Sequence, residues 1–210
     1  PAFVRYLREA YAGQELHTLE KDILKTDLEK DLKIAGPIKV FGNIPYNITS
    51  PILEWLIENR ALVSDAVLTV QWEVAERLAA RPKTKAWGAL SLFVQVYAGI
   101  ELVKRIPRGA FYPAPKVDSA TVRLSLGKNP RYALKSEDAF FCLVRRAFQK
   151  RRKTILNALT DKNSLAMNRE FVFDVLRKSG TDPGRRPETL SIEEWVRLAD
   201  TFHGEYRPVC

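Results

Sequence analysis

The chain has 210 residues, 46% of them hydrophobic and 28% charged, which predicts a soluble globular protein of one large domain or two small ones. No apolar run reaches the roughly 18 residues of a membrane-spanning helix, and the N-terminus does not resemble a signal peptide. We therefore expect neither a membrane span nor a membrane partner. The net charge of +9 predicts a polyanionic partner.

The numbers of cysteines and histidines bear on the cellular compartment and on metal binding. Two cysteines, Cys142 and Cys210, are too few for a disulfide framework, which favours a reducing cytoplasm. The only histidines, His17 and His203, lie far apart with no ligand spacing around them. We therefore expect no metal site.

In chain order, the first part of the sequence mostly alternates strands and helices. Apolar spacing and turn residues predict helices over residues 1–11, 50–57, 74–80 and 89–97, and strands over residues 15–20, 38–44, 65–71, 101–106 and 119–126. The strand at residues 38–44 alternates little, as in a sheet covered on both faces. Ser50 is a good N-cap, and Pro51 suits a first helical turn. The pattern predicts an α/β fold with a largely parallel sheet, ending in an antiparallel pair.

After residue 126 the pattern becomes entirely helical. Helices are predicted over residues 136–146, 153–159, 169–179 and 192–202. We place the boundary near residues 127–135, which gives an α/β domain over 1–130 and a small all-α domain over 131–210. Residues 1–126 carry a net charge of +3 and residues 127–210 carry +6, so the basic excess lies in the helical part.

The segment Asn43-Ile44-Pro45-Tyr46 follows a predicted strand directly, where ligands bind in open α/β sheets. A simple strand-to-helix turn is one interpretation, since Asn and Pro are turn residues. The alternative is methyl transfer to an adenine N6 amine. The Asn43 oxygen and the Ile44 carbonyl can accept its two hydrogens and aim its lone pair at a methyl donor. Pro45 restrains the backbone, and Tyr46 offers a stacking face for a flipped-out base.

This segment resembles the Asn-X-Pro-Tyr signature of N6-adenine methyltransferases. The chain as a whole resembles the ribosomal RNA adenine dimethyltransferase family, of the bacterial small-subunit type linked to kasugamycin sensitivity. The matching segments are NIPYNITSPIL, VQWEVAERL, GALSLFVQ, GAFYPAPKVDSATV, RAFQKRRKTILNAL and RRPETLSIEEWVRLA. The resemblance implies a Rossmann-like class I methyltransferase sheet and S-adenosylmethionine as cosubstrate.

The same resemblance assigns further residues to the site. It makes Phe111 a second stacking surface facing Tyr46, where the residues alone suggest a proline-stiffened connection. It makes Asp22 the acceptor for the adenine amine of the donor. It also assigns Ile23 and Asn43 to the donor-binding site. A loop aspartate or a helix cap is the alternative for Asp22. Lys21 also replaces the glycine that the family has before this aspartate.

Basic residues cluster where RNA phosphates are expected. Six lie within nine positions: Arg145, Arg146, Lys150, Arg151, Arg152 and Lys153. We interpret them as phosphate contacts, with a solvated helix face as the alternative. Arg108, Lys116, Arg185 and Arg186 are further candidates, although Lys116 is equally well explained as a surface lysine. Trp195 is expected to pack the last helix rather than stack on RNA.

The donor half of the family's site is not found in this sequence. The ten glycines never form GxGxG, and no second strand ends in an acidic residue for the donor's ribose. Two strands of the family's sheet would lie between the strand at 15–20 and the strand at 38–44. We therefore expect that an N-terminal segment is absent. We also expect that the chain as given binds S-adenosylmethionine poorly and is inactive, which calorimetric titration of the donor would test.

The resemblance implies dimethylation of N6 on two adjacent adenines near the 3′ end of small-subunit ribosomal RNA, with naked RNA or the 30S particle as substrate. A cytoplasmic monomer is expected. One alternative is the large-subunit adenine methyltransferase of macrolide resistance, which shares the Asn-X-Pro-Tyr core. Another is a non-catalytic assembly factor that only binds ribosomal RNA through its basic helices.

Overall fold

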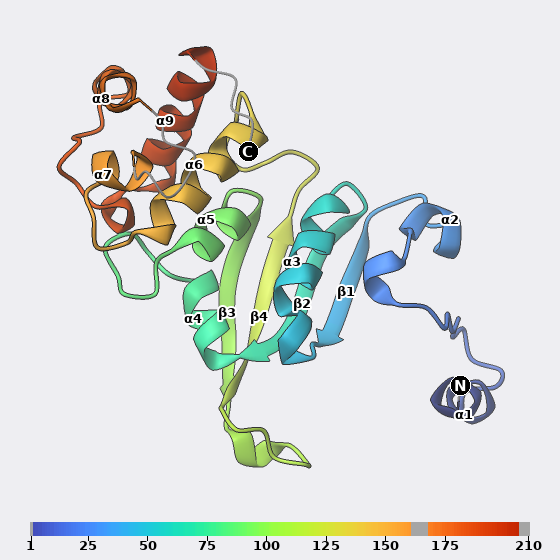
Figure 1. Ribbon diagram of the computed structural model, residues 1–210. Helices are drawn as coiled ribbons and strands as arrows, with labels where there is room; N and C mark the ends of the chain where they lie inside the picture. The colour runs from blue at the N-terminus through green and yellow to red at the C-terminus, as the bar shows by residue number, and fades with distance from the viewer. Residues whose placement is uncertain (1, 161–167, 206–210) are drawn as a thin grey trace.

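The computed structural model describes residues 2–160 and 168–205 (Figure 1). Four strands form one sheet in the order β1-β2-β4-β3. They are β1 (Ile38–Asn43), β2 (Val63–Gln71), β3 (Ala98–Ile106) and β4 (Ser119–Leu126). β1 runs parallel to β2, whereas β4 is antiparallel to both of its neighbours.

The α/β class and the antiparallel pair are confirmed. β1, β2 and β3 run in the same direction, and only β4 runs opposite to them, but its place between β2 and β3 makes two of the three pairings antiparallel. The helix α3 (Thr49–Glu58) connects β1 to β2 and makes that pair parallel. β3 and β4 are joined without a helical crossover of comparable length, and β4 lies between β3 and β2. The connection over residues 107–118 holds only the 3₁₀ turn η3 (Arg108–Ala110), so the chain folds back beside β3 instead of crossing over the sheet through a helix.

The prediction of a strand over residues 15–20 is wrong. These residues have no regular structure and pair with none of the described strands. A strand without a partner leaves its backbone groups unpaired, so sequence propensity alone does not stabilise it. The elements that follow are η1 (Ile23–Lys25), a 3₁₀ turn, and α2 (Leu28–Leu32), a short helix capped by Asp27. Neither is predicted from apolar spacing.

The remaining helices lie close to their predicted positions. They are α1 (Ala2–Ala10), α4 (Trp72–Leu78), α5 (Ala89–Gln95), α6 (Glu137–Gln149), α7 (Ile155–Leu159), α8 (Arg169–Lys178) and α9 (Ile192–Glu205). The predicted cap of α3 is wrong. The 3₁₀ turn η2 (Tyr46–Ile48) leads directly into α3, so the helix begins at Thr49 and its N-cap is Ile48 rather than Ser50.

Helices α3, α4 and α5 lie on one face of the sheet, and α6 to α9 gather beyond its upper end (Figure 1). The predicted buried face of α3 is confirmed, since Ile52, Leu53, Leu56 and Ile57 are all buried. Trp195 is fully buried and packs α9, as predicted. One hydrophobic cluster continues from the sheet into the helical part. The division near residues 127–135 stays a prediction.

The opposite face of the sheet is more exposed than predicted. β1 was expected to be covered on both faces, yet its residues alternate between half-buried and exposed. The Phe41 side chain is 74% exposed. Arg123 of β4 lies on an exposed part of the sheet and pairs with Asp65 of β2 at 2.7 Å. The double cover expected for β1 is therefore not seen among the described residues.

Two further observations concern the compartment and membrane predictions. Each helix in the described parts of the chain is too short or too polar to cross a bilayer. Cys142 is buried in α6, whereas Cys210 lies outside the described residues.

Candidate active site

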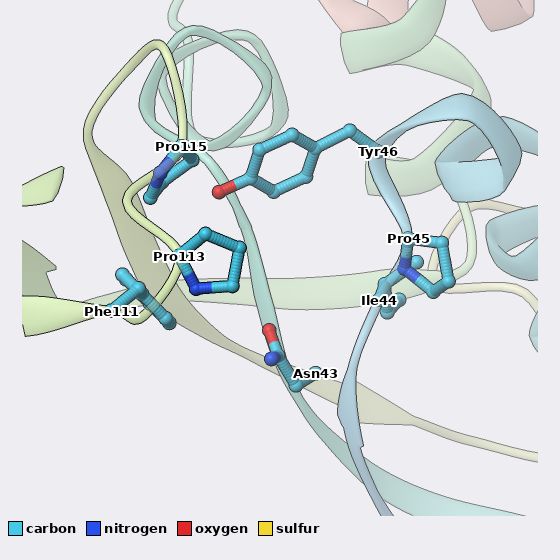
Figure 2. A pocket seen from close by; sticks show the side chains of 7 residues that line it. All are labelled: Asn43, Ile44, Pro45, Tyr46, Phe111, Pro113 and Pro115. Atoms are coloured by element: carbon cyan, nitrogen blue, oxygen red, sulfur yellow. The ribbon is translucent and has the colours of Figure 1, made fainter.

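A pocket of about 280 Å³ opens where β1 ends. Two segments far apart in the sequence line it. One contributes Asn43, Ile44, Pro45 and Tyr46, and the other contributes Phe111, Pro113 and Pro115 from the connection between β3 and β4. Figure 2 shows the two segments on opposite sides of the pocket, with the Tyr46 ring projecting from one toward the other. The structure thus brings together the predicted acceptor segment and the predicted stacking residue Phe111.

The backbone at the end of β1 is anchored on both sides of Asn43. The Ile44 N–H donates to the Thr69 carbonyl oxygen at 3.1 Å, which continues the β1–β2 pairing one residue past the strand. The Ile44 side chain is 4% exposed and packs into the core. Asn43 is exposed, and Figure 2 shows its amide pointing into the space bordered by Pro113 and Pro45. A fixed backbone therefore presents a free amide to the pocket.

The Tyr46 ring is held by a hydrogen bond at its far end. Its hydroxyl lies 2.7 Å from the Ser119 Oγ, with either oxygen able to donate. Ser119 is fully buried at the start of β4, so its side chain has a fixed position. The ring is therefore tethered both by the turn η2 and by the sheet. A tethered aromatic face is a preformed stacking surface for a base.

The stem of the Phe111 loop is organised by Asp118. The Arg108 N–H donates to the Asp118 carboxylate at 3.0 Å, and the Arg105 guanidinium donates to it at 2.8 Å. These bonds hold the pKa of Asp118 below its usual range, the Arg108 N–H contributing most and Arg105 next. Arg105 also lies over the Trp72 ring, 4.5 Å from its centroid. The carboxylate thus ties the loop that carries Phe111 to the β3–β4 stem.

Several residues of this pocket are not identified by sequence reasoning. Pro113 and Pro115 line it, while Asp118 and Ser119 hold its walls. All four lie within the segment FYPAPKVDS, whose alternating prolines after two aromatics are a usable signal. The pairing of Ser119 with Tyr46 joins residues 73 positions apart, and no sequence pattern indicates it.

Of the predicted donor-side residues, Asn43 lines this pocket, whereas Asp22 and Ile23 lie at the start of η1, outside the set that lines it. Asp22 is the N-cap of η1, since its Oδ1 accepts the Leu24 N–H at 3.1 Å. This is the helix-cap role that the sequence left open. Asp22 and Ile23 are both exposed, and the carboxylate needs only one oxygen for the cap. A carboxylate oxygen beside an exposed apolar side chain has the chemistry that an adenine amine and ring require. The donor role of both residues stays a prediction.

The predicted RNA-binding residues fall into two groups. Six are exposed: Arg108, Lys116, Arg145, Arg152, Lys153 and Arg186. Four are partly buried: Arg146, Lys150, Arg151 and Arg185. Arg151 donates to Glu188 at 3.1 Å, and Arg185 pairs with Glu194, a pairing that raises the pKa of Arg185. Arg151 and Arg185 thus have protein partners, and contact of any of these residues with RNA stays a prediction.

Metal ligands are not gathered in the described parts of the chain, where no group of three or more His, Cys, Asp or Glu side chains could hold an ion.

The chain matches the family described as Ribosomal RNA adenine dimethylase over residues 1–202. It is 40% identical over 196 residues to the Ribosomal RNA small subunit methyltransferase A of Alkaliphilus oremlandii, covering 92% of this chain and 67% of that protein. The protein of the same description from Clostridioides difficile is 42% identical over 188 residues, covering 88% and 64%. The chain thus spans about two thirds of the length of these relatives.

Solved structures show the same likeness in three dimensions. A dimethyladenosine transferase from Plasmodium falciparum superposes with a TM-score of 0.73 at 28% identity, covering 96% of this chain and 76% of that one. The 23S rRNA methyltransferase ErmE superposes with a TM-score of 0.68 at 26% identity, covering 97% and 79%. These matches confirm the Rossmann-like methyltransferase fold with its helical part. The chain belongs to the ribosomal RNA adenine dimethylase family.

Proposed function

We propose that the protein transfers methyl groups from S-adenosylmethionine to N6 of two adjacent adenines near the 3′ end of small-subunit ribosomal RNA. The main support for this proposal is that Asn43–Tyr46 and the Phe111–Pro115 loop line one pocket. Relatives described as small-subunit methyltransferases, about 40% identical over most of the chain, support the choice of substrate.

The pocket supports this chemistry through fixed dipoles rather than a strong base. The adenine N6 lone pair is delocalised into the ring and is a poor nucleophile. The Asn43 amide oxygen and the Ile44 carbonyl accept the two N6 hydrogens, which favours a pyramidal nitrogen with a directed lone pair. The anchored backbone at Ile44 limits the reorganisation that this requires. The donor, when bound, supplies an electrophilic methyl group.

The walls of the pocket hold the base. Tyr46 stacks on one face, and base–aromatic stacking is worth roughly 1–3 kcal/mol. Phe111 and the two prolines border the opposite side. A base paired within a helix is unstacked before it enters, which is cheapest for an unpaired base. Dimethylation further requires that the pocket readmit the monomethylated base.

Asp22 and Ile23 are the residues that we assign to the donor, together with Asn43. The carboxylate accepts from the donor's adenine amine, and the Ile23 side chain, 38% exposed, packs against its ring. Weak donor binding and inactivity of the chain as given stay predictions. The exposed cations Arg108 and Lys116, on the loop that lines the pocket, are assigned to RNA phosphates. We also propose that the protein acts in the cytoplasm as a monomer on RNA or on the 30S particle.

The test is methyl transfer by the product of the natural gene, supplied with labelled donor and with either small-subunit or large-subunit particles. We expect dimethyladenosine in small-subunit RNA only. Label in the large-subunit RNA would favour the alternative that the likeness to the 23S enzyme ErmE raises. RNA binding without label in either would favour a non-catalytic assembly factor.

A further inference from the structure

We propose that the loop between α4 and α5 supplies a third segment of the RNA-binding surface. Its exposed cations Arg81, Lys83 and Lys85 would join those of two segments from the helical part. We call the combined set the junction surface, and it consists of Arg81, Lys83, Lys85, Arg152, Lys153 and Arg186. Its ligand is the phosphate backbone of RNA, so the inference rests on the proposed function and extends it to a loop of the α/β part.

Hydrogen bonds hold the loop against the helical part. The Arg151 guanidinium donates to the carbonyl oxygens of Lys85 and Trp87 at 3.0 and 3.1 Å, and to the Glu188 carboxylate at 3.1 Å. The Lys83 N–H donates to the Glu188 carbonyl oxygen at 2.9 Å. Figure 1 shows the loop after α4 running toward α7. One arginine and one glutamate therefore join the loop to the end of α6 and to η4 (Pro187–Thr189).

The third segment is joined in the same way. The Ile155 N–H donates to the Arg185 carbonyl oxygen at 2.6 Å, which ties the start of α7 to the residue before Arg186. Arg185 is itself bonded to the Thr189 carbonyl oxygen at 2.6 Å. Residues 81–85, 152–153 and 186 thus belong to one bonded junction. Arg151 and Arg185 bond within the protein and hold these segments together. Their sequence neighbours Arg152 and Arg186 are exposed to solvent.

The loop is rigid enough to present charge in a fixed place. The Gln95 amide donates to the Leu78 and Ala80 carbonyl oxygens at 2.7 and 2.9 Å, and Trp87 is fully buried. Lys83 has φ of 70°, a left-handed conformation that is unfavourable for a non-glycine residue. Its bond to the Glu188 carbonyl helps to maintain that conformation. Little backbone entropy therefore remains to be lost in the loop when a ligand binds.

The charge balance of the junction favours an anionic ligand. No side chain of the junction surface has an ion-pair or hydrogen-bond partner among residues 2–160 and 168–205. Glu188, the carboxylate that is bonded into the junction, pairs with Arg151. Asp182 is exposed and accepts the Gly184 N–H. Unpaired cations spread over three segments suit a repeating phosphate chain better than a single small anion.

The test compares RNA affinity at several salt concentrations for the triple variant Arg81→Ala/Lys83→Ala/Lys85→Ala. Each phosphate contact contributes about 0.7 to 0.9 to the slope of log affinity against log salt. We therefore expect the slope to fall by about 2 in magnitude for three lost contacts, with affinity reduced on the order of tenfold or more at low salt. Equal thermal unfolding midpoints would show that the loop variant is folded.

A matched control removes the same charge at the other end of the molecule. The variant Arg5→Ala/Lys25→Ala/Lys39→Ala also neutralises three exposed cations, which lie on α1, η1 and β1. We expect the salt slope of this control variant to change by less than half of the change seen in the loop variant. An unchanged slope in the loop variant, or an equal loss in the control, would overturn the inference.

The two proposals fail separately. If the product of the natural gene methylates small-subunit RNA and the loop variant keeps its slope, only the junction surface is refuted. If the loop variant loses slope but the product of the natural gene methylates nothing, only the proposed function is refuted.

Discussion

The Tyr46 hydroxyl and the Ser119 Oγ lie 2.7 Å apart, and this hydrogen bond joins the turn after β1 to the first residue of β4. The ring of Tyr46 lines the pocket, whereas Ser119 is buried behind it. We therefore predict that Ser119 is a positioning residue, acting on the substrate only through the orientation of the Tyr46 ring.

The Ser119→Ala substitution removes this bond without touching the pocket. A hydrogen bond contributes about 0.5–1.5 kcal/mol, so we expect methyl transfer to fall by up to about tenfold and stability to fall by about 1 kcal/mol. Tyr46→Phe should cause a similar loss, and the double variant no further loss. Single-turnover methylation across this double-mutant cycle is the measurement. Additive losses would contradict the positioning role.

The Asn43→Ala substitution removes one of the two proposed N6 acceptors. Removing a single fixed dipole from a transition state costs about 10²–10³-fold in rate. We expect that loss in methyl transfer by the product of the natural gene carrying the substitution, with RNA affinity unchanged in a filter-binding measurement. Asn47→Ala is the matched control, because Asn47 is also exposed nearby in η2 but does not line the pocket. Full activity of Asn43→Ala would refute the role assigned to the amide.

Asp118 predicts a pH dependence of stability. The Arg108 N–H and the Arg105 guanidinium lower its pKa, so the carboxylate stabilises the folded state. This contribution is fully present above the unfolded pKa of about 3.9 and is lost as the pH falls through the folded value. Asp118→Asn should therefore lower the thermal unfolding midpoint at pH 6, with the difference shrinking below about pH 4. A difference that is constant from pH 6 to pH 2.5 would contradict this.

Arg151 and its neighbour Arg152 should behave differently although they are adjacent and alike. Arg151 bonds to two carbonyls and to Glu188, so Arg151→Ala should destabilise the fold by about 1–3 kcal/mol, measured by denaturant unfolding. Arg152 is exposed with no partner among the described residues, so Arg152→Ala should leave stability within about 0.5 kcal/mol and weaken RNA binding. Equal effects of the two substitutions on stability would count against the structural role of Arg151.

Much of the fold follows from local patterns. The apolar run Ile52, Leu53, Leu56, Ile57 predicts a buried helix face, and the structure buries all four side chains. The strands at 38–44, 65–71, 101–106 and 119–126 are found within a few residues of their predicted bounds. Alternation and helical spacing depend on the neighbours of each residue, so the sequence is sufficient for them.

Pairing is not local, and there the predictions are wrong. Residues 15–20 have strand propensity but pair with none of the described strands. β4 inserts between β2 and β3, so it pairs antiparallel with β2 as well as with β3, and the pairing with β2 is not predicted. Both outcomes depend on which backbone groups find partners across the chain.

By itself, the sequence determined the class of the protein and the family resemblance, and it predicted the acceptor segment Asn43-Ile44-Pro45-Tyr46, because short motifs of fixed spacing encode these. Only the tertiary structure decided what holds that segment. It brought Ser119 to Tyr46 and the Phe111 loop to the end of β1. It also decided that Arg151 bonds within the protein while Arg152 faces solvent. Adjacent arginines look alike in a sequence, and only the packing around each guanidinium distinguishes a structural contact from a free charge.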